Sequence, residues 1–118
     1  MTECVMYNMI LGNYHPSTIC VEMSKLEDSL NALSDIIDSE YIEDEMQEFI
    51  SRYARTDEIM PEDKTVGFIV VHRDKKNFAI SINKNDKKLA DSLIRIAQKF
   101  ASKGFRVDTD IAGLEKNE

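Results

Sequence analysis

The chain has 118 residues, of which 42% are hydrophobic and 31% are charged, and its net charge is −7. This length and apolar fraction predict one globular domain with its own core, and argue against both a second domain and an acidic disordered segment. The two cysteines, Cys4 and Cys20, are too few for a disulfide framework. No segment has the pattern of a signal peptide or the apolar length of a membrane span, so we expect a cytoplasmic protein with no membrane contact.

The charge is divided unequally between two halves of the chain. Residues 1–63 contain 15 acids and 3 bases, which gives −12, and residues 64–118 contain 7 acids and 12 bases, which gives +5; together they make −7. Most of the excess lies in residues 22–48, where ten acids accompany one base, Lys25. A concentrated anionic segment of this kind attracts cationic partners.

The first predicted element is a β-hairpin. Residues 4–11 and 18–23 are apolar runs on either side of a segment containing Gly12 and Pro16, and this order of run, turn and run is typical of a hairpin. One face of the first strand would carry Val5, Tyr7, Met9 and Leu11. The other face would also be apolar, through Cys4, Met6 and Ile10, which predicts a strand covered on both sides or an interface. A hairpin closing symmetrically about residues 14 and 15 would place Cys20 opposite Met9.

Two amphipathic helices are predicted next. Ser24 and Glu27 have the spacing of a capping box, so a helix should begin there. Apolar residues then recur at spacings of four, three and four: Leu26, Leu30, Leu33 and Ile37. A second helix is expected over residues 40–54, with the apolar stripe Ile42, Met46, Phe49 and Tyr53. The pattern leaves open whether the two helices are separate.

Strand patterns return after a loop predicted over residues 56–63. Residues 65–72 and 78–83 read as a second hairpin around a polar turn, with one solvated face. Asn85 or Asp86 can cap a third helix with the stripe Leu89, Leu93, Ile96 and Phe100, which Gly104 would end in a left-handed conformation. Residues 105–107 would form a short last strand, and residues 111–118 are expected to be a disordered tail.

These elements predict a single α+β domain over residues 1–110. Hairpins with one apolar face and helices with one apolar stripe must bury these surfaces against each other. The expected architecture is a two-layer sandwich in which an antiparallel sheet of four or five strands carries helices on one side, in the order ββααββα(β). The octets 26–33 and 89–96 share four of eight residues, which raises the hypothesis of an internal repeat.

Residues able to perform chemistry are few, and their spacing favours no known site. The chain contains neither a Cys-x-x-Cys or His-x-x-x-His pair for zinc nor a Gly-rich phosphate loop. The tripeptide at residues 72–74 matches three letters of the kinase catalytic loop, but the other kinase motifs are absent. A ribonuclease-like acid and base would require His15 and His72 to meet at one substrate. We therefore expect no catalytic residue, no metal and no cofactor, and keep the two-histidine enzyme as a third hypothesis.

The leading functional hypothesis rests on the acidic helices. Their outer faces carry carboxylates with almost no lysine at helical spacing, so local pairing does not explain them. The profile of size, charge and compartment resembles that of small bacterial toxin-immunity proteins, which implies an inhibitor that binds a basic, nuclease-like or other nucleic-acid-processing partner. Carboxylates would select that partner and tyrosines would anchor it. The candidate partner-binding residues are Asp28, Asp35, Asp38, Glu40, Tyr41, Glu43, Asp44, Glu48 and Tyr53.

Two alternatives remain open from the sequence. A phage-encoded mimic of nucleic acid would use the same anionic surface. The second alternative is a regulator that binds nucleic acid or a nucleotide through a basic patch at the second hairpin turn and the start of the third helix. Lysines at a helix start oppose the helix dipole, and a bound phosphate would explain their presence there. The residues of this alternative anion-binding patch are Lys75, Lys76, Lys84, Lys87 and Lys88. The oligomeric state is left open.

Overall fold

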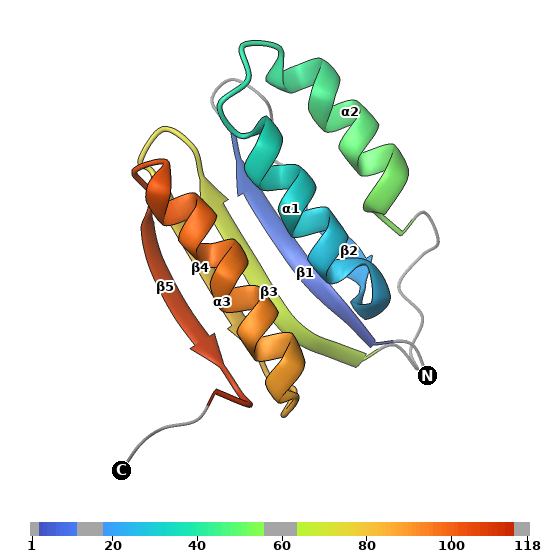
Figure 1. Cartoon of the computed structure of the whole chain (residues 1–118). Helices are drawn as coiled ribbons and strands as arrows, with labels where there is room; N and C mark the ends of the chain where they lie inside the picture. The colour runs from blue at the N-terminus through green and yellow to red at the C-terminus, as the bar shows by residue number, and fades with distance from the viewer. Residues whose placement is uncertain (1–2, 12–17, 56–63, 115–118) are drawn as a thin grey trace.

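The computed structural model describes residues 3–11, 18–55 and 64–114 (Figure 1). The elements in chain order are β1 (Glu3–Ile10), β2 (Thr18–Glu22), a 3-10 turn (Met23–Lys25), α1 (Leu26–Ile36), α2 (Ile42–Tyr53), β3 (Lys64–His72), β4 (Asn77–Ile82), α3 (Lys87–Ser102) and β5 (Arg106–Ile111). The predicted α+β class and element order are confirmed, with the last strand fully formed. The two acidic helices are separate, and the predicted 56–63 loop lies outside the described residues.

The five strands form one mixed sheet in the order β2-β1-β3-β4-β5. β1 pairs with β2, and β3 with β4, in antiparallel fashion, but β1 and β3 are parallel, as are β4 and β5. The prediction of a wholly antiparallel sheet is therefore wrong. The parallel pairs arise from the helical connections. Two helices, α1 and α2, join β2 to β3, so β3 runs opposite to β2 and therefore parallel to β1, whereas the single helix α3 makes β5 parallel to β4.

All three helices cover the same face of the sheet (Figure 1). The predicted inner face of β1 is fully buried at Val5, Tyr7, Met9 and Leu11, as is the α1 stripe of Leu26, Leu30, Leu33 and Ile37. In α2 and α3 the stripes are buried except at Tyr53 and Leu89, which pack on the core while partly exposed. The core thus lies in one layer between sheet and helices, as the helical and strand periodicities predicted.

The helix starts differ from each other. No side-chain hydrogen bond caps α1, whose N-cap residue is Lys25, so the predicted capping box is wrong. The cause is the 3-10 turn, which already curls the chain and satisfies the Leu26 amide with the Met23 carbonyl. In α3 the prediction is confirmed: Asp86 Oδ1 accepts a hydrogen bond from the Leu89 amide at 3.0 Å, and Gly104 ends the helix region with φ 91°.

Two further predictions are corrected by the described residues. Cys20 lies opposite Met6 rather than Met9, because the strands pair about a point earlier than the middle of the turn sequence. The boundary at residue 110 is also wrong: Ile111 ends β5 and is 5% exposed, and Leu114 packs on the core. Residues 111–114 therefore belong to the domain, and residues 115–118 lie outside the described part of the chain.

The arrangement of the two hairpins does not support an internal repeat. β1 and β3 lie side by side and parallel, while β2 and β4 flank them on opposite sides. Both following helices, α1 and α3, cover the same face and run in the same direction (Figure 1). The two hairpin-and-helix units therefore have opposite handedness: in one the second strand lies on one side of the first, and in the other it lies on the opposite side. Units of opposite handedness cannot be superposed by a rotation, as a structural repeat would require. We attribute the shared octet to the common pattern of an amphipathic helix.

Candidate partner-binding surface

The predicted partner-binding residues lie on α1, on α2 and on the connection between them. The two helices are side by side in Figure 1. Every carboxylate of the set is exposed, and these residues are Asp28, Asp35, Asp38, Glu40, Glu43, Asp44 and Glu48. Tyr41 is 71% exposed in the connection, whereas Tyr53 is partly buried against Phe49, with 5.1 Å between their ring centroids. Tyr53 is thus mainly a core residue, and Tyr41 is the accessible aromatic of this surface.

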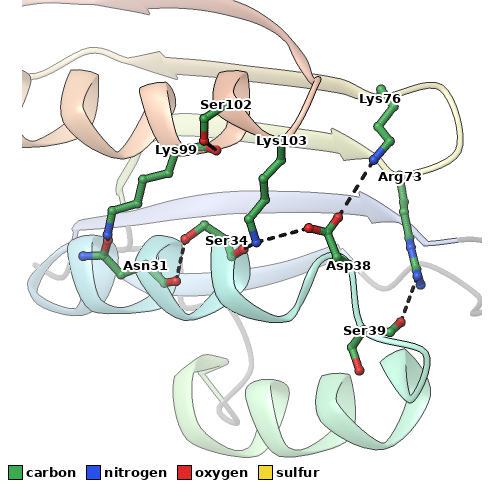
Figure 2. A network of polar contacts seen from close by, with 9 residues as sticks. All are labelled: Asn31, Ser34, Asp38, Ser39, Arg73, Lys76, Lys99, Ser102 and Lys103. Atoms are coloured by element: carbon green, nitrogen blue, oxygen red, sulfur yellow. Dashed lines mark hydrogen bonds and ion pairs between the residues drawn. The ribbon is translucent and has the colours of Figure 1, made fainter.

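Part of the charge division is compensated inside the molecule (Figure 2). Asp38, just beyond the end of α1, lies 3.4 Å from Lys103 Nζ and 3.9 Å from Lys76 Nζ. Arg73 Nη2 donates to the Ser39 carbonyl at 2.8 Å. These cations come from the turn after β3 and from the C-cap of α3, and they gather at the C-terminal end of α1, where the helix dipole is negative. Asp38 is therefore engaged in structural ion pairs.

The other acids of the surface are less compensated. Within the described residues, only Glu48 among them makes an ion pair, at 3.2 Å to Arg52 on the same helix. Asp28 lies in the first turn of α1, and Glu43 and Asp44 lie in the first turn of α2, where carboxylates stabilise the positive end of the dipole. Asp35 and Glu40 have neither an ion pair within the described residues nor a position in the first turn of a helix. The surface therefore carries negative charge beyond what helix stability requires.

A cavity of about 160 Å³ lies between α1 and α2 and was not predicted from the sequence. Its apolar lining comes from Ala32, Ile36, Phe49 and Tyr53, and its charged lining from Glu45, Glu48 and Arg52. Glu45 Oε2 is shielded from solvent and has no hydrogen-bond partner among the described residues. An apolar wall beside the exposed carboxylate of Glu48 can receive the methylene stem and the charged head of a lysine or arginine. From the sequence, the spacing of Glu45, Glu48 and Arg52 predicts that they share one face of a helix. The cavity itself could not be predicted, because it forms only where α2 packs against α1.

The lysines of the alternative anion-binding patch do not meet. Lys75 and Lys76 precede β4, while Lys84, Lys87 and Lys88 follow it, so a six-residue strand separates the two groups by roughly 20 Å. Lys76 also lies 5.0 Å from the Phe105 ring centroid. Lys84 hydrogen-bonds Glu3, and this contact lowers the pKa of the Glu3 carboxyl. The structure thus divides the predicted patch between opposite ends of the sheet.

The remaining candidates for chemistry are dispersed. His72 ends β3, and its Nδ1 accepts a hydrogen bond from the Lys75 amide at 3.3 Å, while His15 lies outside the described residues. Cys4 and Cys20 are buried and form no disulfide with each other. Across residues 3–11, 18–55 and 64–114, no three metal-ligating side chains gather. In the same residues no helix has both the length and the apolar content to cross a membrane.

Comparisons with known proteins place the chain in a family. Residues 1–110 match the family described as Thermoplasma acidophilum protein TA0956. An NMR structure of TA0956 is 51% identical, covers 93% of this chain and 99% of its own chain, and superposes with a TM-score of 0.75. No curated protein matches. These descriptions name no activity or partner. The chain belongs to the family of Thermoplasma acidophilum protein TA0956.

Proposed function

We propose that the protein is a non-enzymatic inhibitor of the immunity type, which binds a basic, nucleic-acid-processing protein through α1, α2 and their connection. The observation that carries the proposal is Tyr41. Its side chain is the most exposed large hydrophobic group in the described residues, at 71%, and it is flanked along the chain by Glu40, Glu43 and Asp44. An exposed aromatic surrounded by carboxylates suits an interface, because tyrosines concentrate binding energy and charges select the partner.

The surface offers two different contributions to binding. The exposed carboxylates accelerate encounter with a cationic protein, and this effect weakens as salt screens the charges. Tyr41 would slow dissociation by burying its ring in the partner. The cavity between α1 and α2 adds a specific contact, because a partner lysine or arginine inserted there would place its stem on the apolar wall and its charged head at the exposed Glu48 carboxylate.

A nucleic-acid-processing partner is favoured by the geometry of the charges. Such proteins display lysine and arginine in grooves that accept a phosphate backbone, and exposed carboxylates on two packed helices can occupy such a groove. A phage-encoded mimic of nucleic acid would bind in the same way, in the cytoplasm in either case. Direct binding of nucleic acid has less support, because the candidate lysines lie at opposite ends of β4.

Co-purification of the tagged chain from its native host tests the proposal. The wild type should recover one basic protein in a stoichiometric complex, at an ionic strength near that of the cell. A Glu43→Lys/Asp44→Lys variant should lose it, and Tyr41→Ala should weaken the purified complex at least tenfold, which corresponds to about 1.4 kcal/mol. The matched control is Asp74→Lys/Asp91→Lys, which makes the same change in charge at two exposed residues outside α1, α2 and their connection.

The folded state of each variant must be checked by circular dichroism. Reversing two acids in the first turn of α2 weakens the helix dipole interaction by about 0.3–1 kcal/mol each, which a folded domain should tolerate. A complex that survives the α2 reversal and is lost in the Asp74→Lys/Asp91→Lys control would reject this surface. Recovery of an acidic protein, or of nucleic acid without protein, would reject the proposed class of partner.

A further inference from the structure

The face of the sheet away from the helices carries an exposed apolar patch on β3. Phe68 is 58% exposed and Val70 is 40% exposed, and with Tyr41 they are the exposed large hydrophobic side chains of the described residues. Phe68 lies opposite Met6 on β1, and Val70 lies opposite Ala79 on β4. Because paired residues point to the same side of a sheet, these four side chains share this open face. Their neighbours Ile69 and Val71 are buried under the helices.

The position of the patch suggests that it is covered in the working protein. β1 and β3 form a parallel pair in the interior of the sheet, and parallel strands are usually covered on both faces. Here helices cover only one face (Figure 1). Contiguous exposed apolar side chains on a folded domain typically mark an interaction site. This observation is independent of the acidic surface, which lies on the helical layer.

We infer that the open face binds a second copy of this chain, with the two sheets packed face to face. The margin of the open face carries charges of both signs, which can pair with those of a second copy. Arg106, Asp108 and Asp110 project from β5 on this face, since they pair with Asn77, Ala79 and Ser81. A two-fold contact uses the same patch on both subunits, so the arginine of one copy can lie opposite an aspartate of the other.

The long-range charge also permits this arrangement. Each chain carries −7, but its densest acids lie on the helical layer, which would face outward in both copies. The molecule is 19 Å across its shortest axis, so the helical layers would be separated by more than the screening length of about 8 Å at physiological salt. The same charge argument disfavours a nucleic acid as occupant, because Arg106 is the one arginine or lysine that the pairing places beside the patch.

The area of the face sets the expected strength of the dimer. Five strands and about six residues along each give a surface of roughly 20 Å by 20 Å. Two copies would then bury roughly 800–1,000 Å² in total, at the low end for specific interfaces. The dimer should therefore be weak and reversible, visible at high protein concentration and dissociated on dilution.

Sedimentation velocity over a dilution series, in reducing buffer, tests the inference. The wild type should pass from dimer to monomer on dilution, and Phe68→Arg should raise the dissociation constant at least tenfold. Val70→Lys should act in the same direction. The matched control Gln98→Arg changes an exposed residue of α3 and should leave the equilibrium unchanged. Because both side chains at β3 are exposed, the variants should remain folded, which circular dichroism would verify.

Salt separates this contact from the proposed binding of a basic partner. Added salt should leave the dimer largely unchanged, because the contact is mainly apolar and the anionic helical layers lie beyond the screening length, whereas it should weaken a complex with a basic protein. A wild type that stays monomeric at every concentration would overturn the inference, as would a dimer indifferent to Phe68→Arg. Titration with a single-stranded oligonucleotide completes the test: binding that is lost in Phe68→Arg would assign the face to nucleic acid instead.

Discussion

Tyr7 and Ser29 form a buried hydrogen bond that joins β1 to α1, and removing either partner should have unequal effects. Ser29 Oγ donates to the Leu26 carbonyl at 2.9 Å, so the Tyr7 hydroxyl must be the donor in its own contact with Ser29. Tyr7→Phe removes this donor but leaves Ser29 with a partner. Ser29→Ala instead leaves the Tyr7 hydroxyl buried without an acceptor. The tyrosine is fully buried, so no solvent replaces the lost contact.

The expected magnitudes follow from this asymmetry. Loss of an ordinary hydrogen bond costs about 0.5–1.5 kcal/mol, whereas an unsatisfied buried donor costs about 1–3 kcal/mol. Ser29→Ala should therefore destabilise the protein more than Tyr7→Phe, even though alanine slightly favours the helix. For a chain of 118 residues, each kcal/mol should lower the melting temperature by roughly 3–5 °C.

Urea denaturation followed by circular dichroism measures these differences directly. The double variant should be close to Tyr7→Phe alone, because a phenylalanine no longer needs the Ser29 acceptor, and the two effects should not add. Tyr7→Phe proving costlier than Ser29→Ala would refute the donor assignment. Strict additivity in the double variant would refute the coupling between β1 and α1, the helix that carries part of the acidic surface.

Three further predictions concern stability. Burial raises the pKa of Tyr7 above its ordinary value near 10, so the unfolded state loses the hydroxyl proton at a lower pH than the folded state does. Stability should therefore fall as the pH rises above about 10. Urea denaturation should show a shallower fall for Tyr7→Phe, which has no hydroxyl to titrate. Gly67→Ala should cost about 1–3 kcal/mol or prevent folding, because an added Cβ would lie 2.4 Å from the Ser81 carbonyl oxygen; wild-type stability in a thermal melt would contradict this packing. Asp86→Ala removes the N-cap bond to the Leu89 amide and should cost about 1 kcal/mol, whereas Asp86→Asn should retain most of the stability in the same assay.

Local periodicity was sufficient to predict the helices, most strand positions and the buried stripes. The burial of Leu26 or Val5 depends on the side of its own element that meets the core, and spacing along the chain encodes that side. The Asp86 cap and the Gly104 turn are equally local. For the same reason the exposure of Glu43, Asp44 and Tyr41 was predictable before their surroundings were known.

Features that depend on distant contacts were not predictable in this way. The parallel pairing of β1 with β3 follows from the path of α1 and α2 across the sheet, which no short segment encodes. The ion pairs of Asp38 join α1 to Lys76 and Lys103, which are far away in the sequence. The cavity beside Glu45 exists because α2 packs on α1. Sequence alone therefore located the anionic surface but overstated how much of it is uncompensated.

The central claim is that the helical layer binds a basic protein through its carboxylates and Tyr41. The most direct measurement is a calorimetric titration of the recovered partner with wild type and with Glu43→Lys/Asp44→Lys, at low and at moderate salt. We predict one-to-one binding by the wild type that weakens with salt, and a much weaker, less salt-sensitive interaction for the variant. Equal affinity of the two proteins at both salt concentrations would contradict the claim.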